Sequence, residues 1–189
     1  MNGSLAQTTS LPIFQWQRTA RHQYSVLSRT SVYGTLSFSL ERSVLFLPEQ
    51  REYYRASAVI DGRVSFFKCL FREGRFRGCI AIEEGQSESF VFFDPQPARV
   101  LRRQISWIVF SEGGEAWLWL PGRSEGQWVV RAGGQRILEV RSSMADLAGT
   151  VHVYDPTLLE RSYGPMLVFF CAYLAIGPHR ASRIPLNSD

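Results

Sequence analysis

Residues 165–176 have the sequence PMLVFFCAYLAI, and this stretch decides the fold. All of its side chains are apolar apart from the hydroxyl of Tyr173, so a helix here has no polar face. A helix that is apolar all round is buried on every side. At about 1.5 Å per residue it is about 18 Å long, close to the height of a small barrel. We expect this helix in the interior of a closed or nearly closed sheet; the alternatives are an oligomer interface and shallow insertion into a membrane.

The residues around this stretch set its limits. Asp155-Pro156 suits the N-cap and first position of a short helical turn that runs to Leu159. A proline inside a continuous helix removes a hydrogen-bond donor and clashes with the preceding turn. We therefore expect a kink or break near Gly164-Pro165, with the helix starting at the proline. Gly177-Pro178 then ends the helix.

The preceding part of the chain is a succession of short strand-like segments separated by turns. A spacing of roughly 8–12 residues per strand is typical of an antiparallel sheet and not of alternating β and α units. The predicted strands are 23–28, 32–39, 43–47, 53–60, 63–70, 76–83, 88–93, 105–111, 115–120, 127–132, 135–141 and 149–154.

Several of the connections have the composition of tight hairpins. Asp61-Gly62, Gly113-Gly114 and Gly133-Gly134 each suit a two-residue turn in which both residues need a positive φ. Residues 71–76 predict a further hairpin. Residues 94–104 contain two prolines and predict a turn or a connection across the domain.

We expect a single domain of the all-β class with one C-terminal helix: an antiparallel barrel of about 12 strands enclosing that helix. The 189 residues are about the size of one ordinary domain. Residues 1–20 are expected to form a loosely ordered arm, with Phe14 and Trp16 as docking points. The barrel domain is placed at 21–180 and a flexible tail at 181–189.

About twelve strands followed by one buried apolar helix resembles the tubby C-terminal-like superfamily, which includes tubby domains, phospholipid scramblases and LURP-one-related proteins. The resemblance rests on the strand succession 23–154 and on the ending DPTLLERSYGPMLVFFCAYLAIG. It implies a twelve-stranded barrel around the C-terminal helix, and binding of phosphoinositides or other phospholipids. Two features depart from the family pattern. Gly177-Pro178-His179-Arg180 stands where an acidic residue often follows the helix, and Gly164-Pro165 interrupts the helical region.

No arrangement of residues predicts catalysis, and no catalytic residue or cofactor is expected. Cys69 and Cys79 are too far apart for a zinc motif and have no histidine near them, although they can face each other across the predicted hairpin. His152, on a strand, is more typical of a structural residue than of a ligand. Phosphate-binding and dinucleotide-binding loops are not found. We predict no metal site, and the sequence gives catalysis no support without excluding it.

Cationic side chains give the one functional prediction. The formal net charge is +4, which favours anionic partners without the strong field of a nucleic-acid-binding protein. The candidates for binding a phosphate headgroup are Lys68, Arg72, Arg75 and Arg77 around one hairpin, with Arg102 and Arg103 in the connection that follows. Guanidinium groups bind phosphate through charge-assisted hydrogen bonds. The plainer alternative is that each is a solvated surface residue.

The leading hypothesis is a non-enzymatic module that binds anionic phospholipid headgroups, or a membrane-proximal adaptor. One alternative is a lipocalin-like barrel that carries a hydrophobic small molecule or pigment, which needs an empty lumen. Another is a protein-interaction subunit using the aromatic hairpin 105–120, with Trp107, Trp117 and Trp119 as the patch; that hairpin is either covered on both sides or exposes the patch. Nucleic-acid binding is disfavoured, because acidic residues are interleaved with the arginines and no recognised motif is present.

The expected location is the cytoplasm, with or without peripheral attachment to a membrane. Residues 1–10 lack the basic and then apolar pattern of a signal peptide. The apolar run at 166–176 is shorter than the roughly 20 residues that cross a bilayer as a helix. Three cysteines, an odd number, favour a reducing compartment.

Overall fold

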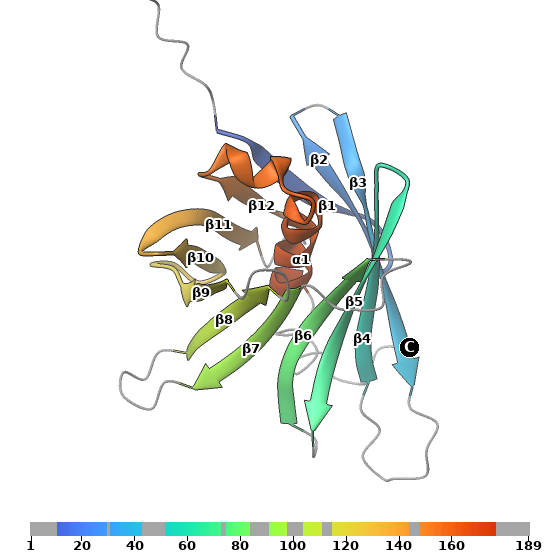
Figure 1. The fold of residues 1–189 in the computed structure, drawn as a ribbon. Coiled ribbons are helices and arrows are strands. Elements are labelled where there is room, and N and C mark those ends of the chain that lie inside the picture. The colour runs from blue at the N-terminus through green and yellow to red at the C-terminus, as the bar shows by residue number, and fades with distance from the viewer. Residues whose placement is uncertain are drawn as a thin grey trace, which may run out of the picture.

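In the computed structural model the described residues are 11–29, 31–42, 52–72, 75–83, 91–97, 104–110, 115–143 and 148–176. They form twelve strands, a 3₁₀ helix and an α-helix (Figure 1). The strands are β1 (Ile13–Ala20), β2 (Gln23–Ser28), β3 (Ser31–Arg42), β4 (Glu52–Ile60), β5 (Arg63–Arg72), β6 (Arg75–Glu83), β7 (Val91–Pro97), β8 (Gln104–Phe110), β9 (Ala116–Pro121), β10 (Gln127–Ala132), β11 (Gln135–Ser143) and β12 (Ala148–Val153). The helices are η1 (Pro156–Glu160) and α1 (Gly164–Ile176).

Antiparallel pairing joins each strand to its neighbours in the sequence. The first strand, β1, also pairs with the last, β12, with Phe14 opposite Val151 and Trp16 opposite Gly149. Every strand therefore has a partner on each side in the strand order. The fold is therefore antiparallel β-sheet with one C-terminal α-helix, and the predicted fold class is confirmed at that level.

The helix α1 lies in the middle of the molecule (Figure 1). It contacts β11 and β12 on one side and β4 and β5 on the other. All side chains from Met166 to Ile176 are buried. Four aromatic contacts tie the helix to the strands: Phe170 to Phe67 at 5.7 Å between ring centroids, Tyr173 to Phe67 at 5.4 Å and to Phe38 at 5.7 Å, and Phe169 to Tyr33 at 6.0 Å. The side of the sheet that packs on α1 is called the inner face below.

The entry to α1 follows the sequence prediction. The Asp155 side chain caps η1 by accepting a hydrogen bond from the Thr157 backbone N–H at 3.1 Å, and Pro156 is the first residue of that helix. The chain then turns, and α1 begins at Gly164, one residue before the expected proline. A Cβ at Gly164 would lie 2.0 Å from the Leu158 carbonyl oxygen, so a residue without a side chain lets α1 start directly against η1.

Two of the predicted hairpin turns have the expected backbone. Asp61 and Gly62 have φ values of 47° and 78°, and Gly133 and Gly134 have 54° and 84°. Positive φ at both central residues defines the turn that matches the twist of paired strands. The hairpin at 71–76 is also present, with Arg72 opposite Arg75. Gly113-Gly114 lies outside the described residues.

The N-terminal prediction was wrong for residues 13–20, which form strand β1 and not a loose arm. Phe14 and Trp16 are buried on the inner face, while Ile13, Gln15 and Gln17, which alternate with them, are exposed; this is the period-two pattern of a half-buried strand. The domain therefore includes this segment. The remaining arm residues 1–10, the predicted strand 43–47 and the predicted tail 181–189 lie outside the described residues.

The turn predicted from residue 94 was placed too early. Strand β7 continues through Pro95 to Pro97 and pairs along its length with β8. On its other side β7 pairs with β6 only over 91–93. Proline has no backbone donor and is tolerated at a strand edge that lacks a partner, so both prolines fit this stretch of β7.

Candidate functional site

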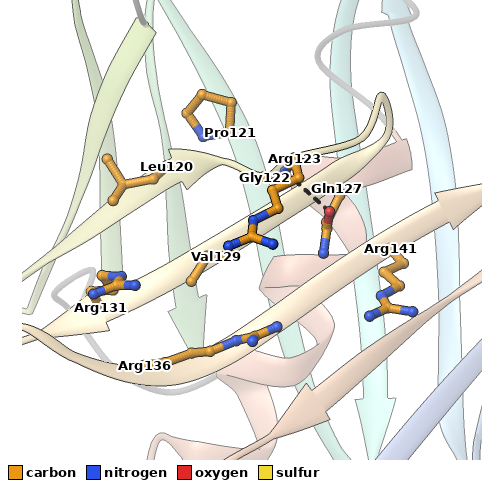
Figure 2. A pocket seen from close by; sticks show the side chains of 9 residues that line it. All are labelled: Leu120, Pro121, Gly122, Arg123, Gln127, Val129, Arg131, Arg136 and Arg141. Carbon is orange, nitrogen blue, oxygen red and sulfur yellow. Dashed lines mark hydrogen bonds between the residues drawn. The ribbon is translucent and has the colours of Figure 1, made fainter.

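A hollow of about 1070 Å³ lies on the outer face of β9, β10 and β11 (Figure 2). We call it the arginine hollow, because four of its nine lining residues are arginines. Its lining consists of Leu120, Pro121, Gly122, Arg123, Gln127, Val129, Arg131, Arg136 and Arg141. The arginines come from the β9–β10 turn, from β10 and from β11, so the hairpin geometry of three consecutive strands gathers them.

A fully buried carboxylate, Glu139, lies among these arginines. Leu138 and Val140 on either side of it face the inner core, so Glu139 points outward. Its Oε1 accepts hydrogen bonds from Gln127 Nε2 and from Arg141 Nε, each at 2.5 Å.

The other oxygen of this carboxylate is also occupied. Glu139 Oε2 accepts a hydrogen bond from the Tyr154 hydroxyl at 3.0 Å and forms an ion pair with Arg136. The carboxylate thus has four donors, and its burial carries no unsatisfied charge. The guanidinium of Arg136 also lies over the Tyr154 ring, 4.3 Å from its centroid.

Gln127 connects this carboxylate to the turn that carries Arg123. The Gln127 side-chain carbonyl accepts hydrogen bonds from the backbone N–H groups of Arg123 at 3.1 Å and Ser124 at 3.2 Å. Its amide group donates to Glu139 at the same time. One side chain therefore fixes the turn and the carboxylate relative to each other.

Two glycines make this turn possible. A Cβ at Gly122 would lie 2.5 Å from Gln127 Cγ, so glycine leaves the space in which Gln127 reaches the turn. Gly126 has a φ of 73°, and a Cβ there would lie 2.5 Å from the Ser142 carbonyl oxygen. A side chain at 126 would therefore meet both strain and a backbone atom.

The arginines keep donors that face outward. The Arg141 side chain is 60% exposed and that of Arg136 is 36% exposed, although each holds the buried carboxylate. Arg131 donates through Nη1 to the Gly134 carbonyl at 3.0 Å. Within the described part of the chain, the Arg123 guanidinium has no ion pair. A guanidinium has five N–H groups, so these contacts leave donors for a ligand.

The electrostatic balance of the hollow favours anions. Four arginines line the hollow, and the nearby acidic residues are the buried Glu139 and the exposed Glu125 of the β9–β10 turn, so the set carries a formal charge of +2. His152, opposite Glu139 in the β11–β12 register, adds little charge. Burial first, and then the positive charges of Arg141 and Arg136, lower the pKa of His152 and favour its neutral form.

Four of the six predicted headgroup candidates lie on strands that the structure describes, β5 and β6. Lys68 is half-buried on β5, and Arg72, Arg75 and Arg77 belong to the β5–β6 hairpin, of which the structure describes the backbone at these three positions. Arg102 and Arg103 lie outside the described residues. Lys68, the candidate whose side chain the structure describes, does not line the arginine hollow. In the strand order β7 and β8 separate this hairpin from the hollow (Figure 1).

The predicted aromatic patch does not form as a surface. Trp117 and Trp119 are buried on the inner face, Trp117 with its ring 4.6 Å from that of Phe110 and Trp119 with its ring 5.9 Å from that of Trp128. Only Trp107 of the three is exposed, at 36%. The strand alternation of β9 turns both tryptophans inward and leaves Leu118 between them outside.

A signal for the hollow was present in the sequence QWVVRAGGQRILEVR at 127–141. The Gly133-Gly134 turn fixes which residues of the two strands face the same way. Gln127 lies opposite Arg141, and Val129 opposite Glu139. Register, together with its shift between Val130 and Arg131, therefore places the charged side chains of both strands on one face, whereas a search for charges close together in sequence misses them.

Three further results concern membrane-spanning helices, metal sites and similarity to known proteins. Within the described residues, neither helix has the length and apolarity of a membrane-spanning segment. In the same part of the chain, no group of three or more His, Cys, Asp and Glu side chains is placed to hold a metal ion. No protein-family model, curated protein or solved structure matches the sequence or the fold.

Proposed function

We propose that this protein is a non-enzymatic binding module that holds the phosphate of an anionic phospholipid headgroup in the arginine hollow. The observation that carries the proposal is the gathering of Arg123, Arg131, Arg136 and Arg141 around one hollow with a buried carboxylate. Guanidinium groups bind phosphate through two parallel, charge-assisted hydrogen bonds. The hollow, at about 1070 Å³, is slightly larger than the roughly 300–1,000 Å³ of typical small-molecule pockets, so a whole headgroup has room in it.

The apolar surroundings of the hollow favour a lipid over a free phosphate. Leu120 and Val129 line it and are paired across β9 and β10. Leu118 lies opposite Arg131 on one side and opposite the exposed Trp107 on the other. Tryptophan is enriched where a membrane meets water, since its ring suits both phases. The outer face here therefore has apolar side chains next to arginines. The apolar side chains suit the hydrocarbon edge of a membrane, and the arginines suit its phosphates.

The fold we propose for this function is a twelve-stranded barrel of the tubby-like type around the central helix α1. The pairing of β1 with β12 and the contacts of α1 with strands on two sides support it. The resemblance to phospholipid-binding families points to the same ligand class, although a fold alone does not determine function. The proposed location is the cytoplasmic surface of a membrane.

Two other functions receive less support. A barrel that carries a pigment needs an open interior, and the buried side chains of α1 occupy that space. An aromatic docking patch needs exposed tryptophans, and Trp117 and Trp119 are buried.

Flotation with lipid vesicles tests the proposal. Wild-type protein should float with phosphatidylcholine vesicles that contain a phosphoinositide, less with pure phosphatidylcholine, and less at high salt. Glycerol 3-phosphate separates the two sources of phosphate. If it binds as tightly as the vesicles, the ligand is a soluble phosphate; if it competes only weakly, the membrane is the partner.

Removing positive charges from the arginine hollow tests whether the headgroup binds there. The double substitution Arg123→Gln and Arg131→Gln leaves the ion pairs of Glu139 with Arg136 and Arg141 in place. It should weaken binding about 30-fold, since each cation near an anionic surface contributes about 1 kcal/mol. The matched control is Arg18→Gln with Arg21→Gln, two exposed arginines near the β1–β2 turn. A second comparison removes Lys68, Arg72, Arg75 and Arg77. Equal losses for the hollow and the control pair, or loss only with the β5–β6 set, would refute the proposed site.

A further inference from the structure

We infer that Glu139 is a positioning residue for the anion site, so that removing its negative charge weakens anion binding. The inference rests on the proposed function and extends it to a residue that does not touch the ligand. Net charge alone gives the opposite expectation, because a carboxylate beneath an anion repels it. The structure offers three reasons why positioning outweighs that repulsion.

The first reason is the number of contacts that the carboxylate makes. Glu139 is fully buried and accepts from Arg136, Arg141, Gln127 and Tyr154. A carboxylate has about four acceptor positions, so these donors use its capacity. An arriving phosphate therefore finds no unpaired Glu139 oxygen, and part of the repulsion is already neutralised by the two guanidinium groups.

The second reason is the geometry that these contacts impose on the arginines. The Arg141 contact uses Nε, which leaves the two terminal nitrogens of that guanidinium for a ligand. Arg136 is held both by Glu139 and by its position over the Tyr154 ring. Arginine side chains carry large rotamer entropy, and a ligand that must immobilise them binds more weakly. Glu139 restricts both before the ligand arrives.

The third reason is the link to Arg123. Gln127 donates to Glu139 and accepts from the backbone of Arg123, so the turn above the hollow is fixed through the same carboxylate. Loss of Glu139 releases the Gln127 amide group and with it one of the contacts that hold the turn. Three of the four arginines in the hollow thus depend on one side chain.

A pair of charge-matched variants tests the inference. Glu139→Gln and Glu125→Gln each remove one negative charge, but Glu125 is exposed in the β9–β10 turn beside Arg123. The measurement is the affinity for phosphatidylcholine vesicles containing a phosphoinositide, with the same vesicles for every variant. Glu125→Gln should bind as tightly as wild type or more tightly. Glu139→Gln should bind about tenfold more weakly, as expected when two long side chains lose their fixed positions.

A second variant separates the positioning role of Glu139 from its charge, and a folding measurement separates it from stability. Glu139→Asp retains the negative charge, but its shorter side chain cannot reach all four donors, so it should also lose affinity. Thermal unfolding followed by circular dichroism shows that a variant is folded. If folded Glu139→Gln binds as tightly as Glu125→Gln, or folded Glu139→Asp binds like wild type, the positioning role is refuted. If wild-type protein does not bind the vesicles, the proposed function itself fails.

Discussion

The substitution Phe169→Ala tests the position of α1 directly. Phe169 is fully buried at the middle of the helix, where its ring stacks on Tyr33. Removing a fully buried phenylalanine side chain destabilises a protein by about 3–5 kcal/mol through lost burial and the cavity that remains. Domains of this size lose roughly 2–4 °C of melting temperature per kcal/mol, so the expected decrease is about 6–20 °C.

The control is the same substitution on the opposite face of the sheet. Phe66 is 46% exposed on β5, so Phe66→Ala should change the unfolding free energy by less than about 1 kcal/mol. Urea unfolding followed by far-ultraviolet circular dichroism measures both variants. A similar small loss for the two substitutions would mean that α1 does not lie in the core, and the account of the fold would be wrong.

Three other predictions concern the turn, a histidine and a thiol. Gly126→Ala should reduce the unfolding free energy by about 1–2 kcal/mol, measured in urea, because its φ is 73° and its Cβ would meet the Ser142 carbonyl; an unchanged value would contradict that geometry. Because the pKa of His152 is lower in the folded protein than in the unfolded chain, the unfolded chain binds a proton at this residue at a higher pH than the folded protein does. Stability should therefore decline as the pH falls below about 6.5, and His152→Asn should flatten the decline; identical pH profiles would assign it to another group. Burial raises the pKa of the Cys171 thiol, so mass spectrometry should find iodoacetamide on Cys171 only after unfolding, and labelling of the folded protein would place the thiol at the surface.

The fold was predictable to the extent that local patterns determine it. The all-apolar run 165–176 required burial, and the glycine-containing turns at Asp61-Gly62 and Gly133-Gly134 required hairpins. Strand β1 was missed because its alternation is short: only Phe14 and Trp16 are buried, and residues 17–20 are all exposed. Pairing of β1 with β12 joins residues at opposite ends of the chain, and no local signal encodes such a contact.

The candidate site was less predictable for a physical reason. Charges that are close together in sequence are the easiest to group, yet adjacent residues of a strand point to opposite faces. The residues of the hollow are gathered by strand register, which places Gln127 opposite Arg141 and Glu139 opposite Val129. The burial of Glu139 could not be predicted, because two of its partners, Gln127 and Tyr154, are 12 and 15 residues away in the sequence.

The most direct test of the central claim is a crystal structure of the protein with bound glycerol 3-phosphate, the phosphate-bearing fragment of a phospholipid headgroup. The phosphate should lie in the arginine hollow, with its oxygens about 2.7–2.9 Å from guanidinium nitrogens of Arg136 and Arg141. The Glu139 contacts with both arginines should be retained in the complex. A phosphate bound at the β5–β6 hairpin, with the hollow empty, would show that the arginine hollow is not the binding site.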